Sequence, residues 1–170
     1  MLVLTFQVGK ERLALDTRRI EAVVPRIPLR TVAGGPPWLS GVFVYHGAIV
    51  PVVDLHRLVG AGDCPPHLSS RIVVIRDPAP SPLTLSPAAG ERGRGEGAAG
   101  EGRLVGLLAA QVDNLQDVKA SAPIGFAAPG MPDLGPVLAE GTSVLRLLDL
   151  ERLLPDSGRQ LVAAMQEQPA

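Results

Sequence analysis

Three pairs of segments in this chain resemble each other in the same order, and this internal repeat restricts the possible folds more than any other feature. The pairs are residues 13–23 with 105–115, 41–50 with 135–144, and 54–58 with 149–153. The last pair reads Asp-Leu-His-Arg-Leu in the first half and Asp-Leu-Glu-Arg-Leu in the second. Because the order is kept across both halves, the sequence predicts two similar lobes.

The runs between turn signals favour strands over long helices. The 19 glycines and 17 prolines divide the chain into short runs rich in Leu and Val, which is typical of β-structure. Strands are expected at residues 1–8, 13–15, 71–76 and 104–110. Short helical turns are expected between Asp16 and Pro25 and at residues 112–115.

Small curled sheets avoid exposed edges by closing into barrels. We therefore predict an all-β fold of two small barrels side by side, with short helical turns. The first lobe is expected at about residues 10–70 and the second at about 71–155, with the N-terminal strand near either lobe.

The segment from Gly41 to Leu58 predicts a β-hairpin, because Tyr45-His46-Gly47 is a turn signal between two β-rich runs. Pro51 lacks a backbone N–H, which favours an edge position or a bulge. Asp54 and Asp149 hold matched places in the repeat, which suits helix caps better than an acid/base pair.

Residues 78–102 differ in composition from the rest of the chain, since they are mostly Gly, Pro and Ala. Such a segment buries too little apolar surface to offset its ordering entropy, so we expect a disordered insertion in a hairpin loop. Its deletion is expected to preserve stability. Residues 156–170 are expected to form a short amphipathic helix and a tail.

The charge balance argues against nucleic acid and anionic lipid as partners, because 16 basic and 17 acidic residues leave a net charge of -1. One cysteine, Cys64, cannot form an internal disulfide and fits a reducing compartment. The first residues resemble neither a signal peptide nor a membrane anchor. We therefore expect a cytoplasmic protein.

The residues offer no convincing chemistry. The three histidines, His46, His56 and His67, lie in turns or loops, and Cys64-Pro-Pro-His67 supplies only two of the four ligands that zinc requires. No positioned base accompanies Cys64, and the glycine-rich tract lacks the Gly-Lys-Ser/Thr ending of a phosphate loop. We expect no catalytic residue, metal or cofactor, and no enzyme.

The segment Gly41-Val-Phe-Val-Tyr-His-Gly-Ala-Ile-Val-Pro-Val-Val-Asp-Leu resembles the signature of the CheW family of chemotaxis coupling proteins: a Gly-Val pair, an Arg-Gly turn, then Val-Pro-Val/Ile-Ile/Val-Asp-Leu. The flanking runs LTFQVGKERLALD, RIVVIRD and LLDLERLL agree. The resemblance covers residues 1–155 except the 78–102 insertion.

This resemblance implies two five-stranded SH3-like barrels around separate cores. It also implies a non-catalytic adaptor of a two-component signal-transduction system. One barrel would dock the regulatory domain of a CheA-type histidine kinase, and the groove between barrels would receive a chemoreceptor's coiled-coil tip. The implied partner-binding residues are Ile20, Gly41, Val42, Tyr45, His46 and Gly47.

Many coupling proteins carry Asn-Leu-Arg-Gly where this chain has Val44-Tyr45-His46-Gly47, so an imidazole replaces a fixed cation. The Gly-Val-Phe-x-Tyr-x-Gly form looks more like couplers of the Wsp type, from arrays that control cyclic-di-GMP. The alternative function is a small-ligand-binding double-barrel sensor. For the adaptor, we expect Gly41→Asp to abolish coupling and to leave the fold largely intact.

Overall fold

The computed structural model describes residues 1–77, 103–119, 133–154, 160 and 164–165. The 78–102 insertion lies outside the described residues, as does most of the expected C-terminal helix at 156–170. In the described part the strands are β1 (Leu2–Val8), β2 (Glu11–Asp16), β3 (Ile20–Pro25), β4 (Leu39–Tyr45), β5 (Ala48–Asp54), β6 (Arg71–Asp77), β7 (Arg103–Asp117), β8 (Val137–Glu140) and β9 (Ser143–Leu147). The helices are the 3-10 helix η1 (Thr17–Arg19), α1 (Leu55–Leu58) and α2 (Leu150–Leu153). The predicted all-β fold is confirmed.

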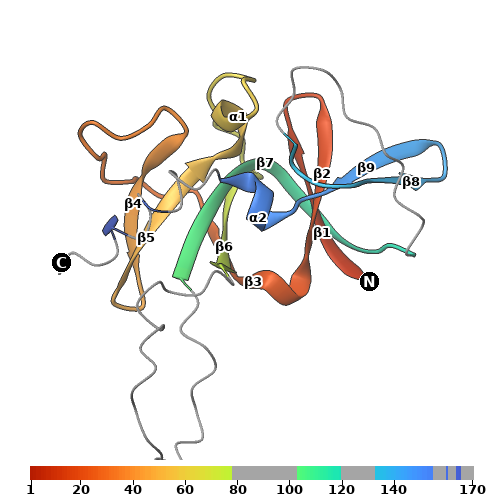
Figure 1. The fold of residues 1–170 in the computed structure, drawn as a ribbon, viewed down its shortest axis with the longest axis horizontal. Coiled ribbons are helices and arrows are strands. Elements are labelled where there is room, and N and C mark those ends of the chain that lie inside the picture. Colours follow the sequence, from red (N-terminus) through yellow and green to blue (C-terminus); the bar gives the residue numbers. More distant parts are fainter. Residues whose placement is uncertain (78–102, 120–132, 155–159, 161–163, 166–170) are drawn as a thin grey trace, which may run out of the picture.

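The strands form two groups of five that share β7 (Figure 1). In one group the order is β3-β6-β7-β5-β4, and in the other it is β7-β1-β2-β9-β8. The first half of β7 pairs with β5 and β6, and its second half pairs mainly with β1. This arrangement is consistent with the predicted pair of lobes.

The strand pairing divides the chain differently from the expected lobes at about 10–70 and 71–155. β6 pairs with β3 and β7 in the first group, whereas β2 pairs with β1 and β9 in the second. The chain therefore enters the second group first, crosses to the other group after η1, and returns along β7. Long-range pairing of this kind leaves no local mark in the sequence.

One of the expected helical turns is a strand, and another is shorter than expected. Residues 112–115 continue β7, in which the backbone bends at Gln111, whose φ is 49°. Between Asp16 and Pro25 the helical part is only Thr17–Arg19, and Ile20–Pro25 is strand β3 with alternating exposure. Its run of β-branched and small residues pairs with β6 in an antiparallel ladder.

In each group, a contact links the two outermost strands or the segments next to them. In the first group a bridge between Arg30 and Val42 connects the segment after β3 to β4. In the second, the side chain of Gln116 on β7 donates a hydrogen bond to Glu140 on β8. Both contacts bring the outer strands of a group toward each other, as barrel closure requires.

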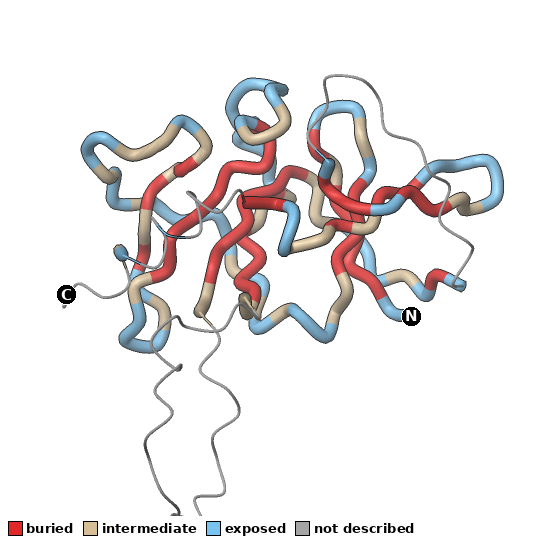
Figure 2. The backbone as a smooth tube through the Cα atoms, viewed as in Figure 1, coloured by how far each residue is buried: buried red, intermediate tan, exposed pale blue. Residues whose placement is uncertain are grey.

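The cores are not separate, contrary to the expectation from the family resemblance. The largest buried cluster takes Leu4 and Leu15 from one group of strands and Val53 and Ile75 from the other, together with Leu107 on β7. Figure 2 shows this buried material running through the middle of the molecule. Smaller clusters lie within each group, around Val50 and Val3 respectively. β7 pairs with strands of both groups, and its Val105, Leu107 and Ala109 side chains all belong to the shared cluster.

The internal repeat corresponds to a hairpin followed by a short helix, which occurs once in each half of the chain. The hairpin β4–β5 followed by α1 in the first half matches the hairpin β8–β9 followed by α2 in the second. Asp54 caps α1 and Asp149 caps α2 through their side chains, as predicted. The repeat therefore specifies the local unit, whereas the assignment of the other strands depends on long-range pairing.

Candidate partner-binding surface

The tip of the β4–β5 hairpin presents an exposed and partly aromatic surface, which we call the hairpin tip (residues 44–47). His46 and Gly47 have φ of 48° and 79°, so both lie in the left-handed region that a two-residue hairpin turn requires. Tyr45 pairs with Ala48 across the turn. The Tyr45 and His46 rings pack edge to face with centroids 4.3 Å apart, and Val44 is 65% exposed.

Gly41 is buried and has a structural role. A Cβ atom at this position would lie 2.7 Å from the Arg30 carbonyl oxygen and 2.8 Å from Leu29 Cβ, and its φ is +152°. The close approach allows Arg30 and Val42 to exchange two backbone hydrogen bonds of 2.9 Å. Gly41→Asp is therefore expected to disturb the fold, which corrects the expectation that it would leave the fold largely intact.

Ile20 lies on a different strand from the other predicted site residues. It begins β3, whereas they lie on the β4–β5 hairpin. Its side chain packs on the large shared cluster, whereas Tyr45 packs on the smaller cluster around Val50. The structure thus places Gly41, Val42, Tyr45, His46 and Gly47 on one hairpin, and Ile20 on another strand, with its side chain packed on a different cluster.

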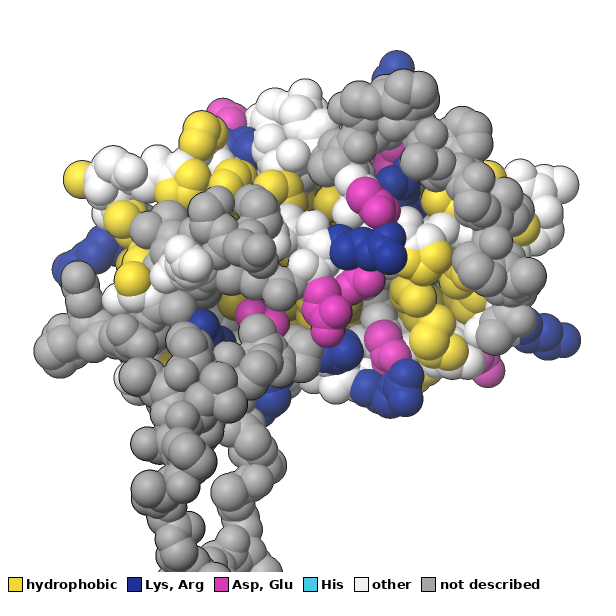
Figure 3. All heavy atoms as spheres, in the orientation of Figure 1, with side chains coloured by type: hydrophobic (Ala, Val, Ile, Leu, Met, Phe, Trp, Pro, Cys, Tyr) yellow, Lys and Arg dark blue, Asp and Glu magenta, His cyan; other side chains and the backbone are white. Residues whose placement is uncertain are grey.

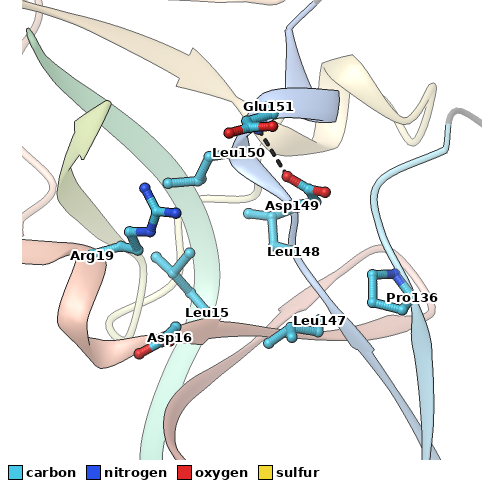
Figure 4. A pocket seen from close by; sticks show the side chains of 9 residues that line it. All are labelled: Leu15, Asp16, Arg19, Pro136, Leu147, Leu148, Asp149, Leu150 and Glu151. Atoms are coloured by element: carbon cyan, nitrogen blue, oxygen red, sulfur yellow. Dashed lines mark hydrogen bonds between the residues drawn. The ribbon is translucent and has the colours of Figure 1, made fainter. Parts of the chain in front are cut away.

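A groove of about 340 Å³ lies beside α2, and none of the predicted site residues lines it. We call it the β2–α2 groove. Leu15, Leu148 and Leu150 supply apolar side chains, and Arg19 and Glu151 lie at its edge (Figure 4). Acidic and basic side chains gather over this middle part of the molecule, with apolar side chains on either side (Figure 3). The matched Asp-Leu-x-Arg-Leu segments were the available sequence signal for α2, but they did not show that it borders a groove.

A buried polar cluster at the start of α1 was not predicted from the sequence. The ligand atoms of Asp54, His56 and Cys64 lie within 4.8 Å of one another, and all three residues are buried. Burial lowers the pKa of His56, partly countered by Asp54, and burial together with the Asp54 charge raises the pKa of the Cys64 thiol to about 11. His67, the possible zinc ligand that accompanies Cys64 in the sequence, is not part of this cluster. Its Nδ1 lies 2.6 Å from the Ser69 hydroxyl.

Comparison with known proteins identifies the family. A model of the CheW-like domain matches residues 2–158. The chain belongs to the CheW-like family. Among the described residues, no helix is long and apolar enough to cross a bilayer.

Two relatives and one solved structure show how this CheW-like chain compares with others. It is 33% identical over 58 residues to "Chemotaxis protein CheW" of Thermotoga maritima, covering 34% of this chain and 38% of that protein. It is 27% identical over 55 residues to "Chemotaxis protein CheW" of Treponema pallidum, covering 32% of each. The matches therefore span about a third of these relatives.

The fold of this CheW-like chain is similar to that of the scaffolding protein TtCheW from Thermoanaerobacter tengcongensis. The TM-score is 0.70 at 16% sequence identity, over 92% of this chain and 89% of TtCheW. The likeness covers both groups of strands and supports the fold, while the binding residues stay a prediction.

Proposed function

We propose that this chain is a non-catalytic adaptor that couples a chemoreceptor to a CheA-type histidine kinase in a cytoplasmic chemosensory array. The observation that carries the proposal is the match of the CheW-like domain to residues 2–158, nearly the whole chain. The names of the relatives, a chemotaxis protein and a scaffolding protein, point in the same direction. The Wsp-type assignment stays a prediction.

Two surfaces suit contacts with other proteins. The hairpin tip combines an exposed Val44 with the Tyr45–His46 ring pair. Aromatic side chains such as Tyr are enriched in the cores of interfaces and among the residues that contribute most of the binding energy. The β2–α2 groove adds leucines with a charged rim, which suits an amphipathic helix. We assign the hairpin tip to the kinase and the groove to the receptor coiled coil.

The first test is a titration of the full chain with the regulatory domain of the CheA-type kinase from the same organism. Val44→Asp places a charge on the hairpin tip and is expected to weaken binding at least tenfold. Val144→Asp is the matched control, because Val144 is also a strand valine and is 62% exposed against 65% for Val44. It is expected to bind as the unchanged protein does.

The possible outcomes distinguish two claims: that the chain is an adaptor, and that the hairpin tip contacts the kinase. No saturable binding by folded, unchanged protein at high micromolar concentration would overturn the adaptor role. Equal affinities of the Val44→Asp and Val144→Asp variants would remove the hairpin tip from the kinase interface.

The second test addresses the groove with a receptor coiled-coil fragment. Arg19 lines the β2–α2 groove and Arg12 does not, although both are exposed. Arg19→Glu is expected to weaken receptor binding at least fivefold, and Arg12→Glu, with the same charge change, is expected to leave it unchanged. Loss of receptor binding in both variants would indicate a general charge effect and would count against the groove.

A further inference from the structure

The loop that follows α1 folds back so that Cys64 reaches the carboxylate of Asp54. The Cys64 N–H donates to Asp54 Oδ2 at 3.1 Å, and the His56 N–H donates to Asp54 Oδ1 at 2.9 Å. These bonds hold three residues of different ligand chemistry around one buried point. A thiol, an imidazole and a carboxylate within 4.8 Å of one another form the ligand set.

The side chain of His56 gives a second, independent observation at the cluster. Its side chain is 5% exposed, and its Nδ1 is buried without a hydrogen-bond partner in the described part of the chain. Buried polar atoms in folded proteins almost always have a partner, so an unpartnered one calls for an explanation. The nearest carboxylate oxygen, Asp54 Oδ1, lies 4.0 Å away, beyond hydrogen-bonding distance.

We infer that Asp54, His56 and Cys64 bind a thiophilic divalent cation, with zinc as the best chemical match. Thiolate and imidazole ligands select Zn²⁺ over Mg²⁺ and Ca²⁺, and three protein ligands leave a fourth position for water. On binding, the Cys64 thiol releases its proton to solvent, and the metal–sulfur bond replaces the S–H bond. A thiolate and a carboxylate then neutralise the 2+ charge, as a buried site requires.

The geometry needs only a small contraction. Zinc–ligand bonds of about 2.0–2.3 Å in a tetrahedron place neighbouring ligand atoms roughly 3.5 Å apart. A pair of ligand atoms at the observed upper limit of 4.8 Å must therefore approach by roughly 1.3 Å. Gly60 and Gly62, with φ of 76° and 85°, give the loop to Cys64 room to adjust. Arg57 approaches Asp54 at 3.6 Å but has a closer partner in Asp63 at 2.6 Å.

Bound metal would fasten a loop that touches the other group of strands. Ala61 in this loop lies against Gly9 in the β1–β2 turn, where an added Cβ would come within 3.1 Å of Ala61 Cβ. A cation at the cluster would therefore hold the loop in the position that bridges the two lobes.

The test is a titration of the full chain, kept reduced, with Co²⁺ as a spectroscopic substitute for Zn²⁺. We expect one equivalent to give a thiolate-to-cobalt charge-transfer band in the near ultraviolet, which Zn²⁺ then removes. Because Cys64 is the single cysteine in the chain, this band reports only on a site that includes Cys64. The measurement needs no partner protein and is independent of the adaptor role.

Three variants test the ligands. Cys64→Ser is expected to abolish the charge-transfer band and His56→Gln to weaken metal binding more than ~100-fold, since even partners of metal ligands are worth about 10–100-fold. His67→Gln is the matched control, because His67 lies in the same loop region but bonds to Ser69. It is expected to bind as the unchanged protein does. Absence of the band in folded, unchanged protein would overturn the proposal, as would equal losses in His56→Gln and His67→Gln.

Discussion

Replacement of Asp54 by alanine should destabilise the fold far more than the same change at Asp149, although the two occupy matched positions in the repeat. Asp54 has a side chain that is 3% exposed and accepts hydrogen bonds from the backbone N–H groups of His56, Arg57 and Cys64. Loss of a helix cap costs about 1 kcal/mol. The Cys64 N–H, left buried without an acceptor, adds about 1–3 kcal/mol. Asp54→Ala should therefore lower the free energy of unfolding by about 2–4 kcal/mol.

Asp149 provides the control. Its side chain is 35% exposed and accepts one backbone hydrogen bond, from Glu151 N–H at 3.0 Å. Asp149→Ala should cost about 1 kcal/mol or less. Both variants can be compared with the unchanged protein by urea unfolding at neutral pH, with a chelator present so that metal does not contribute. A difference between the two variants below about 1 kcal/mol would refute the reasoning from burial.

Three further predictions concern single positions. Gly41→Ala should destabilise the fold by more than about 2 kcal/mol, and Gly47→Ala by about 1 kcal/mol. Both residues have positive φ, but an added Cβ comes within 3 Å of the backbone at Gly41 and not at Gly47. Equal losses in urea unfolding would contradict this reasoning. The Arg18 guanidinium holds the pKa of Asp16 below its usual 3.8, so the ionised carboxylate stabilises the fold above that value. The stability difference between Asp16→Asn and unchanged protein should vanish as pH falls through the lowered pKa, and a constant difference down to pH ~2 would refute it. Cys64 is 2% exposed, and burial raises its pKa to about 11. A thiol reagent at pH ~8 should therefore label Cys64 rapidly only in denaturant. Rapid labelling of the native protein would contradict the burial.

Local features were predictable from the sequence because they depend on neighbouring residues. Tyr45-His46-Gly47 forms the expected hairpin turn, and Asp54 and Asp149 cap short helices as expected. A turn needs residues that accept positive φ, and a cap needs a side-chain oxygen next to free N–H groups. Both requirements are visible within a few residues of sequence.

Features that depend on distant contacts were predicted wrongly or missed. Gly41 is buried because Leu29 and Arg30 pack against it. The sequence of the hairpin does not predict this contact with a segment outside it. The bend at Gln111 lets one strand serve both groups, whereas the sequence suggested a strand followed by a turn. The grouping of Cys64 with Asp54 depends on the path of the loop, which the spacing from Cys64 to His67 could not reveal.

The two copies of the Asp-Leu-x-Arg-Leu motif have different surroundings in the fold. In the first copy, Leu55 and His56 are buried, and the returning loop covers the Asp54 carboxylate. In the second, Leu153 is the buried residue of the helix, and Asp149, Leu150 and Glu151 line the β2–α2 groove. Among the described residues, the same local geometry therefore lies in a buried interior in one lobe and beside a groove in the other. A helix cap satisfies the first N–H groups of the helix and does not specify what packs over it. In the described part of the chain a loop packs over the first copy and a groove borders the second, so packing by distant segments, and not the motif, makes the two copies differ.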